Sequence, residues 1–181
     1  SSTNPTTSTC NPNNFFIFHE LMYSTNMLKN KFLSFTLFAL VTYSASAIGV
    51  MATIGFKEPW YSLLIKPSYN PPDWIFAPVW TTLYLMMTVA VWIFWHSKNR
   101  HMNTIYIYFI HLIFNTTWSV VFFVFHKIFL ALVVLIILVI LIIILMIRFR
   151  RVNMLSYYLM IPYLLWCFYA LILNASLLIL N

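Results

Sequence analysis

Three apolar segments carry tryptophan, tyrosine or asparagine side chains at helical spacing, so each set falls on one helix face. The sets are Trp80, Tyr84 and Met87; Asn115, Trp118 and Phe122; and Tyr163, Trp166, Ala170 and Asn174. An asparagine in an apolar environment costs free energy unless it finds a partner, and a buried indole N–H requires an acceptor. Such stripes occur in ordinary bundle cores. Three stripes that combine indoles with amides or phenols also suit a pocket for a large flat ligand.

Patterns for catalysis or metal binding are weak in this sequence. Four histidines lack the spacing of a metal site: His96, His101, His111 and His126. Of these, only His111 lies in the interior of an apolar segment. A hydrogen bond inside a bundle is expected there, with an axial contact to a metalloporphyrin as the alternative. Glu58 and Asp73 have no neighbouring carboxylate for general acid–base work. We therefore expect a binding protein rather than an enzyme, with no catalytic residue and no metal site.

Residues 57–77 read KEPWYSLLIKPSYNPPDWIFA and separate the first two apolar segments. Prolines fix backbone angles and reduce the entropy lost when a loop becomes ordered. The loop contains too many prolines for a spanning helix and too many aromatic residues for a plain tether. Two interpretations stay open: an aromatic belt at the lipid headgroups, or a lid over the mouth of a helical bundle. We favour the lid.

The composition places these elements in a membrane. Of 181 residues, 62% are hydrophobic and 7% are charged, whereas an ordinary soluble domain is about 45–50% apolar and about 25% charged. The abundance of aromatic and aliphatic residues excludes a disordered chain. Ten lysines and arginines spread along an apolar sequence form no basic face, so nucleic acid is not an expected partner.

Five apolar segments are long enough to cross a membrane as helices: about 32–56, 78–96, 104–125, 128–147 and 154–181. Barrel strands would alternate apolar and polar residues, and the fourth segment, almost all Leu, Ile and Val, does not. We predict an all-α integral membrane protein, a five-transmembrane-helix bundle with a capping loop between helices 1 and 2. The pocket is expected among helices 1, 2, 3 and 5. Residues 1–31 are predicted to be a polar, disordered tail and residues 32–181 the transmembrane domain.

The basic residues are distributed unequally between the two sides of such a bundle. One side holds Lys29, Lys31, Lys98, Arg100, Arg148, Arg150 and Arg151, and the other holds Lys57, Lys66 and Lys127. The positive-inside rule places the first, more basic side in the cytoplasm.

The segment from Pro59 to Tyr84, PWYSLLIKPSYNPPDWIFAPVWTTLY, resembles the signature of the translocator protein family. This family is also called the tryptophan-rich sensory proteins or peripheral-type benzodiazepine receptors. The likeness continues through Trp92 to Trp95, FNTTWSVVFF from Phe114 and IPYLLW from Ile161, so it covers residues 32 to 181.

The resemblance implies a five-helix bundle in which the loop between the first two helices caps an internal pocket. Family members bind porphyrins such as protoporphyrin IX, haem-like tetrapyrroles, cholesterol in animals, and benzodiazepine-type drugs. The pocket-lining residues that the resemblance implies are Tyr61, Phe76, Trp80, Asn115, Trp118, Trp166, Ala170 and Leu173. We therefore expect a membrane receptor or carrier that requires no cofactor and takes porphyrin as its bound ligand.

Two other functions stay open beside this one: light-dependent degradation of porphyrin, and a scaffold role in a membrane complex. The expected partners are membrane lipid, porphyrin or sterol-like small molecules, and a second copy of the chain in a homodimer. Animal members carry a tyrosine followed by a basic residue near the end of the fifth helix, and here that end reads NASLLILN. The expected location is the mitochondrial outer membrane in a eukaryote, or a cell-envelope membrane in a bacterium.

Overall fold

The computed structural model describes residues 30–181, so the tail predicted at 1–31 lies outside the described residues as far as residue 29. Asn30 caps the first helix, because its Oδ1 accepts hydrogen bonds from Phe32 N (3.0 Å) and Leu33 N (3.3 Å). The chain consists of two units that meet between Ser34 and Phe35, and the second unit, Phe35–Asn181, is compact.

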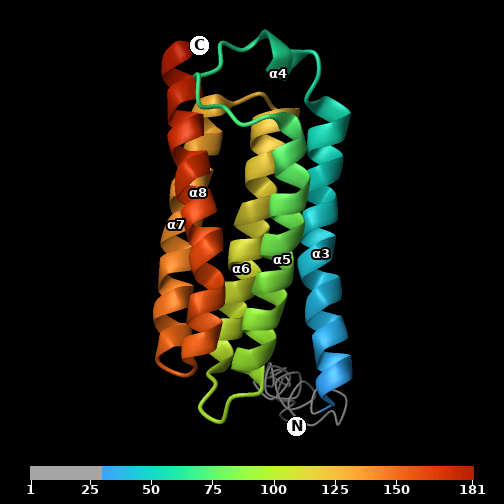
Figure 1. Cartoon of the computed structure of the whole chain (residues 1–181), viewed down its shortest axis with the longest axis vertical. Coiled ribbons are helices and arrows are strands. Elements are labelled where there is room, and N and C mark those ends of the chain that lie inside the picture. The colour runs from blue at the N-terminus through green and yellow to red at the C-terminus, as the bar shows by residue number, and fades with distance from the viewer. Residues whose placement is uncertain (1–29) are drawn as a thin grey trace, which may run out of the picture. The chain divides into compact units, whose positions relative to one another are not determined.

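All regular structure in residues 30–181 is helical (Figure 1). The elements are α3 (Lys31–Phe56), α4 (Trp60–Leu63), α5 (Asp73–Trp95), α6 (Met102–Ser119) with the π-helical turn η1 (Val120–Val124), α7 (Ile128–Arg150) and α8 (Met154–Leu180). Five helical stretches are long and apolar enough to cross a membrane: α3, α5, α6 with η1, α7 and α8. The predicted all-α, five-helix fold class is therefore confirmed.

The helix ends follow local sequence signals. Asn153 caps α8, since its side chain accepts hydrogen bonds from Leu155 N (2.9 Å) and Ser156 N (3.3 Å). Arg148 and Arg150 occupy the last turn of α7, where positive charge is favourable beside the negative end of the helix dipole. The Asn153 side chain thus satisfies backbone N–H groups that lipid cannot satisfy.

Helix α5 begins at Asp73, five residues before the predicted start of the second span. Pro72 precedes the helix, and the Asp73 carboxylate lies in the first turn, where the helix dipole favours negative charge. Pro78 lies inside the helix and removes one backbone hydrogen bond, which did not stop the helix from extending back to Asp73. The loop between the first two spans is therefore shorter than predicted, and residues 57–72 are called the cap below.

Within the compact unit, α6, α7 and α8 pack closely in series, and α5 packs closely against α8. Helix α3 contacts α5 and α6 through long side chains. The Phe38 ring lies 5.8 Å from the Trp95 ring, and Thr42 Oγ1 lies 2.6 Å from the hydroxyl of Tyr108. The small residue Gly49 faces α6, where a Cβ would lie 3.3 Å from Ser119 Oγ. Gly49 therefore packs inside the bundle, where a small residue lets two helix backbones approach closely.

The cap lies across one end of the α5–α8 helices, next to the turn between η1 and α7 (Figure 1). The loops that join α5 to α6 and α7 to α8 lie at the opposite end. This arrangement puts Lys98, Arg100 and the three arginines of 148–151 at the end away from the cap.

Candidate ligand-binding site

Two adjoining cavities lie near the cap. The cap cavity, of about 120 Å³, lies between α4, the end of α6 and α8. The inner cavity, of about 300 Å³, lies between α3, α5 and α6. Both are lined by Asp73, Phe76, Trp118 and Phe123, which form the wall they share. Small-molecule sites have volumes of about 300–1,000 Å³, so the inner cavity lies at the lower end of this range.

The wall beneath the cap is aromatic because the third span ends in a π-helical turn. Neighbouring residues of an α-helix point about 100° apart, but in η1 the consecutive residues Val121, Phe122 and Phe123 are all buried. Trp118 stacks on Phe122, with ring centroids 5.6 Å apart and an interplanar angle of 24°. The Phe123 ring stands edge-on to the Phe122 ring at 4.9 Å. Turns of this kind occur frequently at functional sites.

Asn115 organises the polar side of the inner cavity. Its Oδ1 accepts a hydrogen bond from Tyr84 OH (2.5 Å), and its Nδ2 donates one to Tyr163 OH (3.0 Å). The Trp80 ring packs against these tyrosines, with centroids 5.5 Å from Tyr84 and 6.4 Å from Tyr163. The amide therefore holds two phenols and one indole in position, and it keeps one N–H to donate to a ligand.

Trp118 is fixed by Asn174 of α8. In the amide orientation that satisfies its neighbours, Asn174 accepts a hydrogen bond from Trp118 Nε1 (3.2 Å) and donates one to Ile128 O (3.0 Å). The indole N–H of Trp118 is thus used within the protein. Trp118 presents its ring face to a ligand rather than a hydrogen-bond donor.

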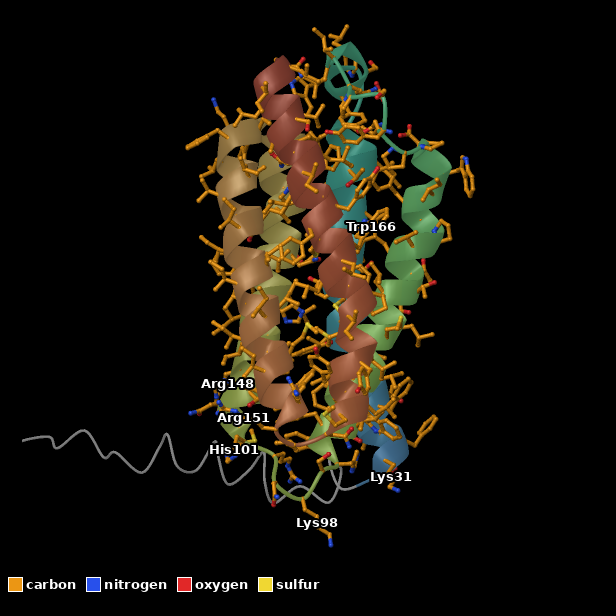
Figure 2. All side chains as sticks on the ribbon, turned by 60° about the vertical axis from the view of Figure 1, so that its left-hand side comes forward. Lys31, Lys98, His101, Arg148, Arg151 and Trp166 are labelled. Carbon is orange, nitrogen blue, oxygen red and sulfur yellow. The ribbon has the colours of Figure 1, made fainter. Side chains whose placement is uncertain are left out.

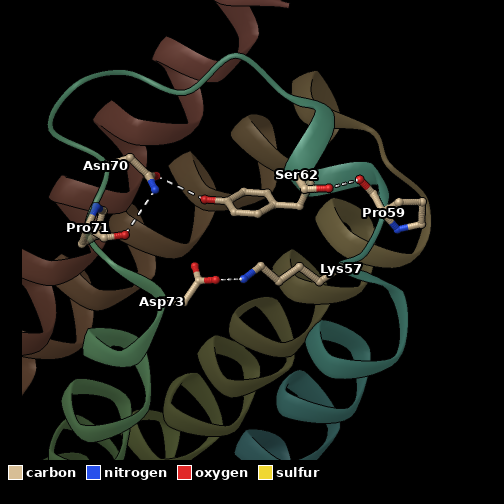
Figure 3. A network of polar contacts seen from close by, with 7 residues as sticks. Lys57, Pro59, Ser62, Asn70, Pro71 and Asp73 are labelled. Atoms are coloured by element: carbon tan, nitrogen blue, oxygen red, sulfur yellow. Dashed lines mark hydrogen bonds and ion pairs between the residues drawn. The ribbon is translucent and has the colours of Figure 1, made fainter.

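The mouth of the cap cavity carries an ion pair between the cap and α5. Lys57 Nζ lies 2.5 Å from Asp73 Oδ2, and their side chains are 19% and 67% exposed (Figure 3). Exposed ion pairs contribute only about 0.2–1 kcal/mol, because water screens them. The pair therefore makes a weak contact between the two sides of the mouth.

Tyr61 is the buried residue of the cap. Its hydroxyl donates to Asn70 Oδ1 (3.2 Å), and the Asn70 amide donates in turn to Pro71 O (3.2 Å; Figure 3). Lys66 Nζ lies 4.4 Å from the centroid of the Tyr61 ring. Burial raises the pKa of the Tyr61 phenol, so the hydroxyl stays a neutral donor.

The far side of the cap is hydrogen-bonded to α8. The Asn181 amide pairs with the backbone of Ile65, as Oδ1 accepts from the N–H (2.9 Å) and Nδ2 donates to the carbonyl (3.1 Å). The Tyr69 hydroxyl lies 2.6 Å from Ser176 Oγ, and the Tyr169 hydroxyl donates to Tyr69 O (2.7 Å). The cap is thus an ordered lid connected to α8, whereas an aromatic belt would need no such contacts.

The predicted site residues fall into two groups in the structure. Those that line the cap cavity, the inner cavity or both are Tyr61, Phe76, Trp80, Asn115, Trp118, Ala170 and Leu173. Trp166 lines neither cavity, although its ring lies 5.9 Å from that of Phe76 in an edge-on contact. Trp166 therefore supports the position of Phe76. Of the described residues that line the two cavities, none belongs to α7, as expected for the fourth span.

Sequence reasoning missed Phe123 and Asp73 as lining residues. A strict α-helical period from Asn115 puts Trp118 and Phe122 on the same face and Phe123 on another. The sequence VVFFV contains no signal that predicts the π-helical turn. Asp73 could have been found, because an acid directly after a proline pair is a common helix start.

These features define a class: a multi-pass helical membrane protein with a capped, aromatic internal pocket. Among residues 30–181, no three side chains of the kinds that bind metal ions come together. The chain belongs to the TspO/MBR family, whose sequence model matches residues 35–180.

Relatives from bacteria and animals match about three quarters of the chain. The tryptophan-rich protein TspO of Chlorobaculum tepidum is 37% identical over 153 residues, which cover 76% of this chain and 94% of that protein. The tryptophan-rich sensory protein of Cereibacter sphaeroides is 32% identical, over 79% of this chain and 92% of its own. The translocator protein of Ovis aries is 29% identical, over 76% and 83%.

Proposed function

We propose that the protein is a membrane receptor or carrier that binds porphyrins, and other flat hydrophobic molecules, in the capped aromatic pocket. The observation that carries the proposal is the meeting of Tyr61, Trp80, Asn115 and Trp118, from three separate helices, at two adjoining cavities under a hydrogen-bonded cap. Membership of the TspO/MBR family supports it. Ring faces in such a pocket favour a planar apolar ligand.

The charge at the mouth suits the carboxylates of a porphyrin. Protoporphyrin IX is a flat macrocycle with two propionate groups on one edge. Among the described residues, Lys57 is the one cation that lines either cavity, and its partner is Asp73. A ligand carboxylate that takes the place of Asp73 beside Lys57 would hold the edge of the ligand at the mouth of the cap cavity.

Entry of such a ligand requires the cap to move. The cap cavity of about 120 Å³ and the inner cavity of about 300 Å³ are small for a tetrapyrrole, and the side chain of Phe76 stands in the wall between them. The polar contacts of the cap with α5 and α8 are exposed hydrogen bonds and one ion pair, which are individually weak. Trp60 and Tyr61 of the cap also pack edge-on against the Phe122 ring. We therefore place ligand entry at the cap, with closure after binding.

The test is a titration of the purified full chain with protoporphyrin IX, followed through the absorption band of the porphyrin. Trp80→Ala removes an indole from the inner cavity and should weaken binding by about 1–3 kcal/mol, the value of one aromatic stacking surface. Trp74→Ala is the matched control, since Trp74 is 72% exposed and lines neither cavity. Equal affinities for both variants would refute the pocket assignment.

The same titration under illumination separates binding from chemistry. Loss of the porphyrin band faster than in free solution, and slower with Trp80→Phe, would indicate light-dependent degradation instead of a carrier function. Absence of saturable binding would favour a scaffold role.

Porphyrin is proposed ahead of sterol because the last helix lacks the tyrosine and basic residue of animal members, and ends in NASLLILN. A homodimer is part of the proposal, with oligomeric state in detergent as its test. We place the protein in the mitochondrial outer membrane if its source is a eukaryote, and in a cell-envelope membrane if it is bacterial.

A further inference from the structure

A third cavity, of about 800 Å³, lies at the end of the bundle opposite the cap, between the start of α6 and the end of α7. Arg148 in the last turn of α7 and Arg151 directly after the helix line it, and Arg100 and His101 line it from the loop before α6. Figure 2 shows His101, Arg148 and Arg151 gathered at this end, away from Trp166. None of its lining residues belongs to the cap cavity or the inner cavity.

Arg148 and Arg151 have no side-chain carboxylate beside them within the described part of the chain. Residues 30–181 contain two acids, Glu58 in the cap and Asp73 at the start of α5. Both lie at the opposite end of the bundle, and Asp73 is paired with Lys57. Guanidinium groups bind phosphate and carboxylate through paired hydrogen bonds, so these two arginines favour an anionic ligand.

A buried hydroxyl gives a second, independent indication of a ligand. Thr104 lines the cavity and is 1% exposed, and its Oγ1 has no hydrogen-bond partner among residues 30–181. Buried hydroxyls are normally hydrogen-bonded. Thr104 lies in the first turn of α6, which has neither an acidic residue nor a side-chain cap. The positive end of the helix dipole at this helix start also favours an anion.

One wall of the cavity is apolar. Ile144 and Ile147 of α7 line it, and they are 38% and 48% exposed. A soluble anion gains nothing from an apolar wall, whereas a phospholipid needs one for the start of its acyl chains. The cavity also lies at the end of the spanning helices, the level at which lipid headgroups are found.

The geometry points to a binding site for the phosphate headgroup of an anionic phospholipid, held by Arg148, Arg151 and the Thr104 hydroxyl. Basic pockets between spanning helices are suited to such headgroups. The positive-inside rule explains the charge of this end of the bundle, but it requires neither a cavity nor a buried unpartnered hydroxyl. The site is independent of the proposed porphyrin pocket.

The test measures lipid retention by native mass spectrometry of the full chain from micelles that contain phosphatidylglycerol and phosphatidylcholine. The wild-type chain should retain phosphatidylglycerol saturably and in preference to phosphatidylcholine. Arg148→Gln with Arg151→Gln should weaken phosphatidylglycerol binding about 25-fold, a factor of about five for each arginine. Thr104→Val keeps the side-chain shape and should weaken binding about tenfold, since it removes a hydrogen bond to a charged group.

The matched control is Lys98→Gln with Arg150→Gln, which removes the same charge from the same end outside the cavity. An equal loss of binding in this control would show a diffuse surface potential and overturn the proposal. Competition by inorganic phosphate at equal strength would show a soluble-anion site and overturn the lipid assignment. Thermal melting in detergent checks that each variant is folded, and unchanged retention by folded Thr104→Val would remove the threonine from the site.

Discussion

The hydrogen bonds between the cap and α8 predict how fast a ligand enters and leaves the pocket. Tyr69→Phe combined with Tyr169→Phe removes two hydroxyls and keeps both rings. The double variant cannot form the hydrogen bond of the Tyr69 hydroxyl with Ser176 Oγ (2.6 Å) or that of the Tyr169 hydroxyl with Tyr69 O (2.7 Å). Neither tyrosine lines the cap cavity or the inner cavity, so the surface that contacts the ligand stays unchanged.

The size of the effect follows from the exposure of these bonds. A hydrogen bond contributes about 0.5–1.5 kcal/mol net, and both bonds are exposed, so the lower value applies to each. Together they stabilise the closed cap by about 1 kcal/mol, which corresponds to a factor of about five in its opening equilibrium. The same bonds close the cap in the free and the bound protein. Association and dissociation rates should therefore both rise about fivefold, while Kd stays the same.

Stopped-flow mixing with protoporphyrin IX measures both rates, and equilibrium titration measures Kd. Tyr158→Phe is the matched control, because Tyr158 is 54% exposed, lines neither cavity and lies near the start of α8, at the end of the bundle away from the cap. The control should leave all three quantities unchanged. A rise in the dissociation rate alone would mean that the two hydroxyls contact the ligand. Unchanged rates in the double variant would mean that entry does not pass through the cap.

Two further predictions concern the stability of the bundle. Tyr84→Phe leaves Asn115 Oδ1 without its donor. It should lower the free energy of unfolding by about 0.6–1.7 kcal/mol, the average and the maximum for hydrogen bonds between membrane helices. Denaturant titration in mixed micelles measures this free energy, and an unchanged value would mean that the Tyr84–Asn115 bond does not stabilise the bundle. Gly49→Leu should lower the melting temperature, because a Cβ there already lies 3.3 Å from Ser119 Oγ, whereas Gly55→Leu should not, because a Cβ there meets nothing within 4 Å. Equal melting temperatures would contradict the α3–α6 contact.

The five spans could be predicted because lipid leaves the sequence few choices. A spanning helix needs about 20 apolar residues, and the observed helices match five such runs. The start of α5 was the exception. The prolines of the cap suggested a longer loop, but Pro72 and Asp73 together begin a helix that continues through Pro78.

The stripes were predictable only as far as α-helical period holds. From Asn115, this period selects Trp118, whose ring faces both cavities. It fails at η1, where the wider turn brings Phe123 to the cavities beside Phe122. The contacts of the cap could not be predicted either, because Tyr69 and Ser176 are 107 residues apart in the sequence. Only tertiary structure brings such pairs together.

The internal hydrogen bonds also set what the pocket can select. The amides of Asn115 and Asn174 make most of their hydrogen bonds to Tyr84, Tyr163 and Trp118. The described residues therefore present aromatic ring faces to a ligand, and few hydrogen-bonding groups. A hydrophobic pocket distinguishes ligands that differ by one methylene by only about 1–3 kcal/mol. We therefore expect selection by flatness and size rather than by polar pattern, and hence a broad range of ligands.

Discrimination between charged and neutral ligands then depends on the mouth of the cap cavity, where Lys57 and Asp73 form a charged pair. A ligand with a carboxylate competes with Asp73 for Lys57, and a neutral ligand of equal shape does not. Lys57→Gln removes that difference and leaves the aromatic walls intact. In this variant the affinity for protoporphyrin IX should fall toward that of its dimethyl ester, while the affinity for the ester stays constant. Equal losses for acid and ester would mean that Lys57 acts on the cap alone, and the pocket would then discriminate by shape only.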